Sequence, residues 1–204
     1  APLVPVDLFR IPAMRYALAA SASTFAGQMA MLVSLPFYLQ ITLERSQLAV
    51  GFLMAGWPAG AAVIALIAGR LSDRYSVALL CAIGAGSMAI GLLGVVLMPA
   101  STSDVWLFAA MLLSGIGFGF FQTPNNRVLI GSAPRHRAGA LGGLQATTRV
   151  FSQTFGAAIV SLVFGLGLVS GPTLGLGVAI FFSLIAVAVN IVRHYLAPQS
   201  KLGA

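Results

Sequence analysis

Four carboxylates are the side chains of this 204-residue chain that could carry protons across a membrane, and they are Asp7, Glu44, Asp73 and Asp104. Each of them falls at the edge of an apolar stretch or outside one. A carboxylate that exchanges protons within a membrane must lie inside it, where the loss of water shifts its pKa toward the working range. The chain therefore contains no obvious proton carrier, and we expect the carboxylates of any proton coupling to lie outside this chain.

Amide, hydroxyl and aromatic side chains recur at helical spacing within two of the apolar stretches. Ser21, Phe25 and Gln28 share one stripe of a helix, and the stretch 105–130 repeats the pattern. Polar atoms on a lipid-immersed helix are costly unless they face protein or water, and ring faces with carbonyl oxygens suit a bulky apolar cation. We predict a substrate-binding wall, with the alternative that the amides only bridge neighbouring helices. The predicted residues are Phe25, Gln28, Ser114, Phe118, Phe121, Gln122 and Asn125.

A short charged loop, residues 69–75, separates the second and third apolar stretches. Asp73 can lie near the start of the next helix, where the helix dipole favours a negative charge. The carboxylate could pair with an arginine in one conformation and release it in another, which would make the loop a conformational latch. The alternative is a positively charged turn that only fixes the orientation of the chain. The predicted latch residues are Gly69, Asp73, Arg74, Arg127, Arg135 and Arg137.

Two further charged positions invite an interpretation. Arg149 lies inside the long fifth apolar stretch. Its side chain could snorkel to the cytoplasmic interface, or it could act as a gating residue that repels cations. Glu44 adjoins Arg45, and we expect these two side chains to form a surface pair.

The composition identifies lipid as the solvent. Hydrophobic residues make up 59% of the chain and charged residues 7%, whereas soluble domains carry about a quarter charged residues. The net charge of +7 comes from basic residues at the ends of apolar stretches, which argues against a nucleic-acid partner. No catalytic Ser/His/Asp set, metal-ligand cluster or phosphate-binding glycine loop is present in the sequence. We therefore expect no enzymatic activity, no cofactor and no metal.

Six apolar stretches are long enough to cross a bilayer, which takes roughly 20 residues. The predicted fold class is an all-α polytopic membrane bundle with helices at 16–43, 47–69, 76–98, 105–130, 139–168 and 174–195. With both termini in the cytoplasm, eight basic residues of the ends and loops lie inside and only Arg45 lies outside. We predict a linker at 1–13, a helical half-domain at 14–197 and a cytoplasmic tail at 198–204, in the inner or plasma membrane.

Glycine pairs at four-residue spacing are expected to let neighbouring helices pack closely in lipid. Such pairs are Gly56/Gly60, Gly115/Gly119 and Gly139/Gly143.

Several segments resemble the major facilitator superfamily. The loop Gly69-Arg70-Leu71-Ser72-Asp73-Arg74 is similar to its signature loop, although Ser76, Val77 and Ala78 stand where the family continues with glycine and basic residues. Residues 36–40, 115–127, 133–139 and 148–157 resemble the C-terminal six helices of fourteen-helix drug:proton antiporters, above all the exporters of methyl viologen and quaternary ammonium compounds.

The resemblance implies a fold and a function. The six helices would form two three-helix inverted repeats, which together make one half of a transporter. The implied function is proton-coupled efflux of lipophilic cationic drugs by alternating access, with the N-terminal half, a small-molecule substrate, protons and membrane lipid as partners. One alternative is a transporter half for a sugar, an organic acid or an anion, and an anionic solute would use Arg149 or Arg127. Another is a membrane scaffold subunit without transport activity.

Overall fold

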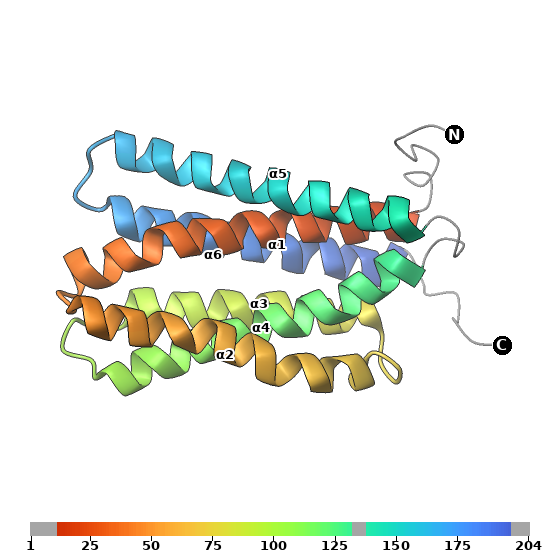
Figure 1. Cartoon of the computed structure of the whole chain (residues 1–204), viewed down its shortest axis with the longest axis horizontal. Helices are drawn as coiled ribbons and strands as arrows, with labels where there is room; N and C mark the ends of the chain where they lie inside the picture. The colour runs from red at the N-terminus through yellow and green to blue at the C-terminus, as the bar shows by residue number, and fades with distance from the viewer. Residues whose placement is uncertain (1–11, 132–137, 197–204) are drawn as a thin grey trace.

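Long apolar runs separated by short polar breaks form six helices in the computed structural model, which describes residues 12–131 and 138–196 (Figure 1). Within these ranges every regular element is helical, so the all-α prediction is confirmed. The first helix begins at a proline, a residue favoured at the first helical position, and so overlaps the predicted linker by two residues. The elements are α1 (Pro12–Phe37), the π-helical turn η2 (Tyr38–Thr42), α2 (Gln47–Leu71), α3 (Val77–Leu97), α4 (Asp104–Gly131), α5 (Ala138–Gly165) and α6 (Gly171–Leu196).

The connection between α1 and α2 is tight and irregular. Pro36 lies just before the π-helical turn, and Glu44 then adopts a left-handed backbone with φ of 54°. Arg45 pairs with Asp104, at 2.9 Å between Nε and Oδ1, and also donates to the carbonyl of Thr102. The expected Glu44–Arg45 pair is therefore wrong. Asp104 is the better partner because it lies beside Arg45 in the first turn of α4, where the helix dipole stabilises its negative charge.

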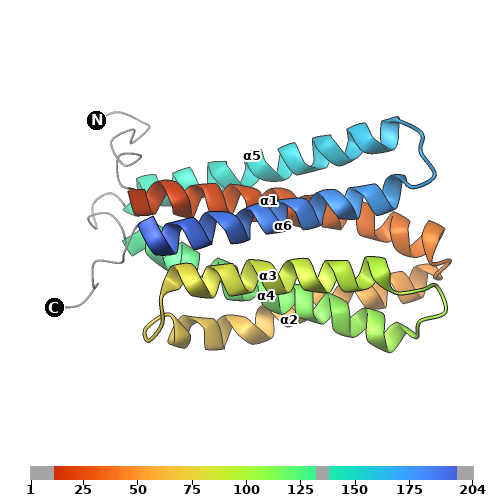
Figure 2. The ribbon, with the colours of Figure 1, turned by 180° about the vertical axis from the view of Figure 1, so that it is seen from behind.

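The helices form two groups of three. One group contains α1, α5 and α6, and the other contains α2, α3 and α4, with the main contact between groups running from α3 to α6. Figures 1 and 2 show the two groups one above the other, with α6 beside α3. Each group combines the first helix of one repeat with the last two of the other: α1 packs on α5 and α6 as α4 packs on α2 and α3. This exchange is the arrangement expected of two paired three-helix repeats.

Glycines set the closest helix contacts. A Cβ added at Gly60 would lie 2.3 Å from the carbonyl oxygen of Leu112, and one added at Gly115 would lie 1.9 Å from that of Trp57. The expected glycine packing is thus confirmed between α2 and α4. A Cβ added at Gly139 or Gly143 would meet no described atom within 4 Å. The expectation is wrong for that third pair, because no described neighbour packs against the start of α5 at these positions.

Five of the described helices are long and apolar enough to cross a membrane, and α5 is not among them. α5 has 28 residues, which is a sufficient length, so its polar side chains account for the difference. Such a helix is tolerated at membrane depth where its polar face contacts protein or water. The polar residues are Gln145, Thr147, Thr148, Arg149, Ser152, Gln153 and Thr154.

The start of α1 and the end of α6 lie at the same end of the bundle (Figure 1). We call this the basic end, because Arg15, Arg70, Arg74, Arg127 and Arg193 belong to the helix ends and the loop found there, whereas Arg45 lies at the opposite end. That the basic end faces the cytoplasm remains a prediction from the charge distribution.

Candidate functional site

A cavity of about 200 Å³ opens between α1, α4 and α5, toward the basic end of the bundle. Phe25 and Gln122, two of the residues predicted to bind substrate, line it together with Arg149. The remaining lining residues are Asn126, Gly142, Gln145 and Ala146. The first half of α5 thus supplies most of one wall, and its glycine and alanine leave the space that a larger side chain would fill.

The chemistry of this cavity is that of neutral amides beside one positive charge. Gln122, Asn126 and Gln145 offer both donors and acceptors, and Phe25 contributes an apolar ring. Arg149 is exposed at this surface and carries the only formal charge among the lining residues. The wall can therefore bind a polar organic molecule through hydrogen bonds, while its own charge attracts anionic or acceptor groups and repels a bare cation.

A second, shallower hollow of about 540 Å³ runs along α5 next to this cavity. Its lining mixes threonines with apolar side chains, and Phe151 remains 72% exposed. The surface of α5 beside the cavity is thus mostly apolar, and no described residue covers it. The lining residues are Ala146, Thr147, Val150, Phe151 and Thr154.

Hydrogen bonds hold the cavity amides from behind. The Nε2 of Gln145 donates to the Oδ1 of Asn126 at 3.1 Å and to the Oγ of Ser21 at 3.3 Å. Ser21 is completely buried on α1, so this contact anchors α5 to the interior of the bundle. The carbonyl oxygen of Gln145 is buried and has no partner within the part of the chain that the structure describes. Two of the three cavity amides are therefore fixed in orientation.

Asn125 lies behind the cavity wall rather than on it. Its side chain is completely buried, and its Nδ2 donates to the Oγ of Ser21 at 2.8 Å and to the carbonyl of Ala17 at 3.1 Å. Its Oδ1 accepts from the Nη1 of Arg193 at 2.9 Å. Although Asn125 was predicted to bind substrate, in this structure it joins α1, α4 and α6.

Ser114 and Phe121 are also turned away from the cavity. Both are buried against α3, where Ser114 meets Gly91 and Phe121 packs with Val77 and Cys81. The reason is helical phase: the stripe through 114, 121 and 125 faces the other helices, whereas Gln122 lies about 100° further round α4. Helical spacing predicted that these residues share one stripe of α4, but the sequence could not show which side of that stripe faces the cavity.

The buried rings of Phe25, Phe118 and Trp57 form a chain across the bundle from α1 over α4 to α2. The centroids of Phe25 and Phe118 are 6.0 Å apart in an edge-to-face arrangement, and those of Phe118 and Trp57 are 4.7 Å apart. Phe118, another residue predicted to bind substrate, is 5% exposed and supports the ring of Phe25 from inside the bundle.

Gln28 bridges two helices. Its Oε1 accepts from the Nε2 of Gln153 at 3.3 Å, which ties α1 to α5 about one turn beyond the cavity. This is the bridging role that we considered as the alternative to cavity lining.

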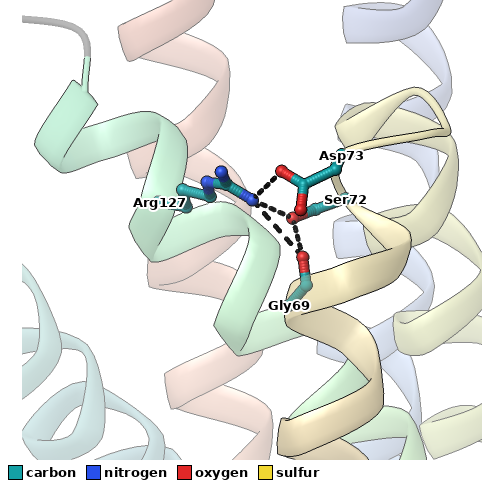
Figure 3. A network of polar contacts seen from close by, with 4 residues as sticks. All are labelled: Gly69, Ser72, Asp73 and Arg127. Carbon is teal, nitrogen blue, oxygen red and sulfur yellow. Dashed lines mark hydrogen bonds and ion pairs between the residues drawn. The ribbon is translucent and has the colours of Figure 1, made fainter.

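Part of the predicted latch is assembled at the basic end (Figure 3). Arg127 pairs with Asp73 at 2.5 Å, and its Nη1 also donates to the hydroxyl of Ser72 at 3.0 Å and to the carbonyl of Gly69 at 3.3 Å. Both charged side chains are more than half exposed. Arg74 is exposed and forms no ion pair with the described residues. Arg135 and Arg137 lie outside the described residues.

Known proteins resemble this chain over most of its length. Residues 1–157 match the family described as Major Facilitator Superfamily. The uncharacterized transporter YebQ of Escherichia coli (strain K12) is 43% identical over 94% of this chain, and the riboflavin transporter RibZ of Clostridioides difficile is 33% identical over 67%. The cephamycin export protein CmcT of Amycolatopsis lactamdurans is 30% identical over 91%. The chain spans less than half of the length of these relatives, namely 42%, 30% and 40%.

Two features of the site escaped the sequence-based prediction. Arg193 is one of the eight basic residues of the ends and loops that we used only to orient the chain, yet its side chain is 3% exposed. The contribution of α5 was underestimated, although the polar stripe from Gln145 to Ser152 was a visible signal. In the structure this stripe holds α5 against α1 and brings Gln145 and Arg149 to the cavity.

Proposed function

The chain belongs to the major facilitator superfamily, and from this premise we propose that it forms one wall of the substrate cavity in a proton-coupled exporter of small organic molecules. The cavity between α1, α4 and α5 is the observation that carries the proposal. It is lined by amides that can bind a solute through hydrogen bonds and by one ring that can cover an apolar part. Its opening lies beside the uncovered face of α5, where a second wall can close it.

The opposite wall and the coupling groups are proposed to come from the N-terminal half of the same protein. The described carboxylates, Glu44, Asp73 and Asp104, all lie at helix ends or in loops, and the last two are paired with arginines. A group that couples transport to protons must change its protonation with the conformation of the cavity. None of these three residues lines the cavity, so the proton carriers are proposed to belong to the other half.

Lipophilic cationic drugs are the first proposed substrates, as the resemblance to drug antiporters implies. The amide oxygen of Gln122 can contact such a molecule beside the ring of Phe25. Since this wall carries only positive charge, the attraction for a cation would have to come from carboxylates of the N-terminal half.

The position of Arg149 favours a second candidate, namely ring-bearing solutes with anionic or carbonyl groups. A guanidinium on the cavity wall donates to carboxylate and carbonyl oxygens in a fixed planar geometry. Two relatives have names that point the same way, one to riboflavin and one to cephamycin export. For this chain the assignment is a proposal, and it separates experimentally from the first.

Transport by the full-length protein in inside-out vesicles tests both candidates. Ethidium serves as the lipophilic cation and fluorescein as the ring-bearing anion, each followed by fluorescence under an imposed pH gradient. Arg149→Glu should abolish fluorescein transport and leave ethidium transport intact or improved. Arg70→Glu is the matched control, since Arg70 is exposed at the end of α2 and outside the cavity. Failure of the wild type to move either probe, or any other organic solute, against its gradient would refute the proposal.

A further inference from the structure

Arg193 is the only arginine that is almost completely buried among the described residues, at 3% exposure, and no described carboxylate pairs with it. We propose that Arg193 is a positioning residue, which fixes the orientation of the cavity amides from the far side of the bundle. The inference rests on the proposed function, because it gives those amides the role of binding substrate. It assigns Arg193 a task beyond setting the orientation of the chain in the membrane.

The burial of Arg193 needs an explanation other than stability. Removing a guanidinium from water is costly, and without a carboxylate the cost is not repaid by a strong ion pair. An apolar residue of similar length, such as methionine, would fill the same space at no such cost. Ionisable groups within membrane helices generally mark functional positions. The place of Arg193 in the last turn of α6, near the carbonyl end of the helix dipole, reduces the cost of its charge but does not require its burial.

The contact with Asn125 shows what the guanidinium can do. An amide side chain can be turned by 180° so that its oxygen and nitrogen exchange places. A guanidinium only donates hydrogen bonds, so the group facing Arg193 must be the oxygen of Asn125. The nitrogen of Asn125 must then face the carbonyl of Ala17 and the hydroxyl of Ser21, as it does at 3.1 and 2.8 Å. Arg193 and the carbonyl of Ala17, which only accepts hydrogen bonds, thereby select the same one of two orientations for a completely buried amide.

Ser21 links the orientation of Asn125 to the residues that line the cavity. The hydroxyl oxygen of Ser21 accepts from Asn125 and also from the Nε2 of Gln145, which itself donates to Asn126. Both Gln145 and Asn126 line the cavity. A chain of four side-chain hydrogen bonds therefore connects Arg193 on α6 with two cavity amides on α5 and α4. Without Arg193 the buried oxygen of Asn125 loses its donor, and only the carbonyl of Ala17 still favours this orientation, so the amides presented to a bound solute are held less firmly.

Kinetics of the full-length protein test this role. Arg193→Met should raise the KM for the transported probe, ethidium or fluorescein, by about tenfold and change the maximal rate by less than about twofold. Arg193→Lys, which also only donates hydrogen bonds, should recover part of the loss. Arg70→Met removes a charge from the same end of the bundle without touching the network, and it should behave like the wild type. Unchanged KM in Arg193→Met, or a lower maximal rate at constant KM, would overturn the proposal.

A second readout does not depend on the substrate. Ala146→Cys, in a background without other reactive cysteines, places a thiol beside Gln145 on the cavity wall. Loss of the network should loosen the start of α5, so Arg193→Met should raise the alkylation rate by N-ethylmaleimide severalfold, and Arg70→Met should not. An unchanged rate contradicts the positioning role. If the wild type transports neither probe but the alkylation result holds, the proposed function fails and the positioning role of Arg193 stands.

Discussion

The carboxylate of Asp73 lies 2.5 Å from the guanidinium of Arg127, and this pair joins the loop after α2 to the basic end of α4. At the opposite end, Arg45 just before α2 pairs with Asp104 at the start of α4. One ion pair thus joins the start of α2 to the start of α4, and the other joins the loop after α2 to the last turns of α4. Among the described residues, no ion pair joins α1 to α5, which is the equivalent contact in the other group.

The first prediction concerns release of the Asp73–Arg127 pair. Asp73→Asn should lower the free energy of unfolding by less than about 1 kcal/mol, because both side chains are more than half exposed. It should nevertheless change the balance between inward-open and outward-open states of the full-length protein. Distances between spin labels across the two halves measure that balance.

Charge exchange provides the control for this prediction. Asp73→Arg combined with Arg127→Asp rebuilds the pair with reversed polarity and should restore the wild-type distance distribution. The latch hypothesis is wrong if Asp73→Asn leaves both the distribution and the transport rate unchanged.

The second prediction concerns the glycine at the contact between α1 and α5. A Cβ added at Gly156 would lie 2.2 Å from the carbonyl oxygen of Ala26, so Gly156→Ala must push the two helices apart. We expect a loss of about 1–3 kcal/mol in stability, typical of overpacking. Thermal unfolding in detergent measures the loss. Gly143→Ala is the matched control on the same helix, since no described atom lies near its new methyl group. Equal melting temperatures for the two variants would contradict the close contact.

The third prediction concerns the left-handed residue of the α1–α2 connection. Glu44 has a φ of 54°, a conformation that costs most side chains roughly 1–2 kcal/mol but that asparagine tolerates well. Glu44→Asn should therefore raise the free energy of unfolding by about 0.5–1 kcal/mol. Because Arg45 pairs with Asp104 instead of Glu44, the substitution breaks no described ion pair. A lower melting temperature would show that the Glu44 side chain has a stabilising contact after all.

The sequence was sufficient to predict the architecture of the half. Runs of apolar residues identified six helices, because the bilayer sets both their length and their composition. The Asp73–Arg127 pair could be expected from two opposite charges at the same predicted end of the bundle. Gly60 and Gly115 could be recognised as packing positions because small residues allow close contact of helices in lipid.

The wall of the site was harder to predict because it depends on the rotation of each helix. Gln122 and Phe121 are neighbours in sequence, yet the first lines the cavity and the second is buried against α3. Periodicity shows that a stripe exists but leaves open which helix it faces. Arg193 was missed for a related reason: a basic residue at the end of an apolar stretch looks like a topology signal whether it points to water or into the bundle.

The most direct test of the proposed cavity is protection of a cysteine on its wall. Ala146→Cys in the full-length protein should react with N-ethylmaleimide, and a saturating concentration of the transported probe should slow that reaction severalfold. The same substitution at Ala158, exposed further along α5 and outside the cavity lining, should show no protection. Protection at 146 alone is the result that the cavity between α1, α4 and α5 predicts. Equal reaction rates with and without a probe that the protein demonstrably transports would place the substrate elsewhere.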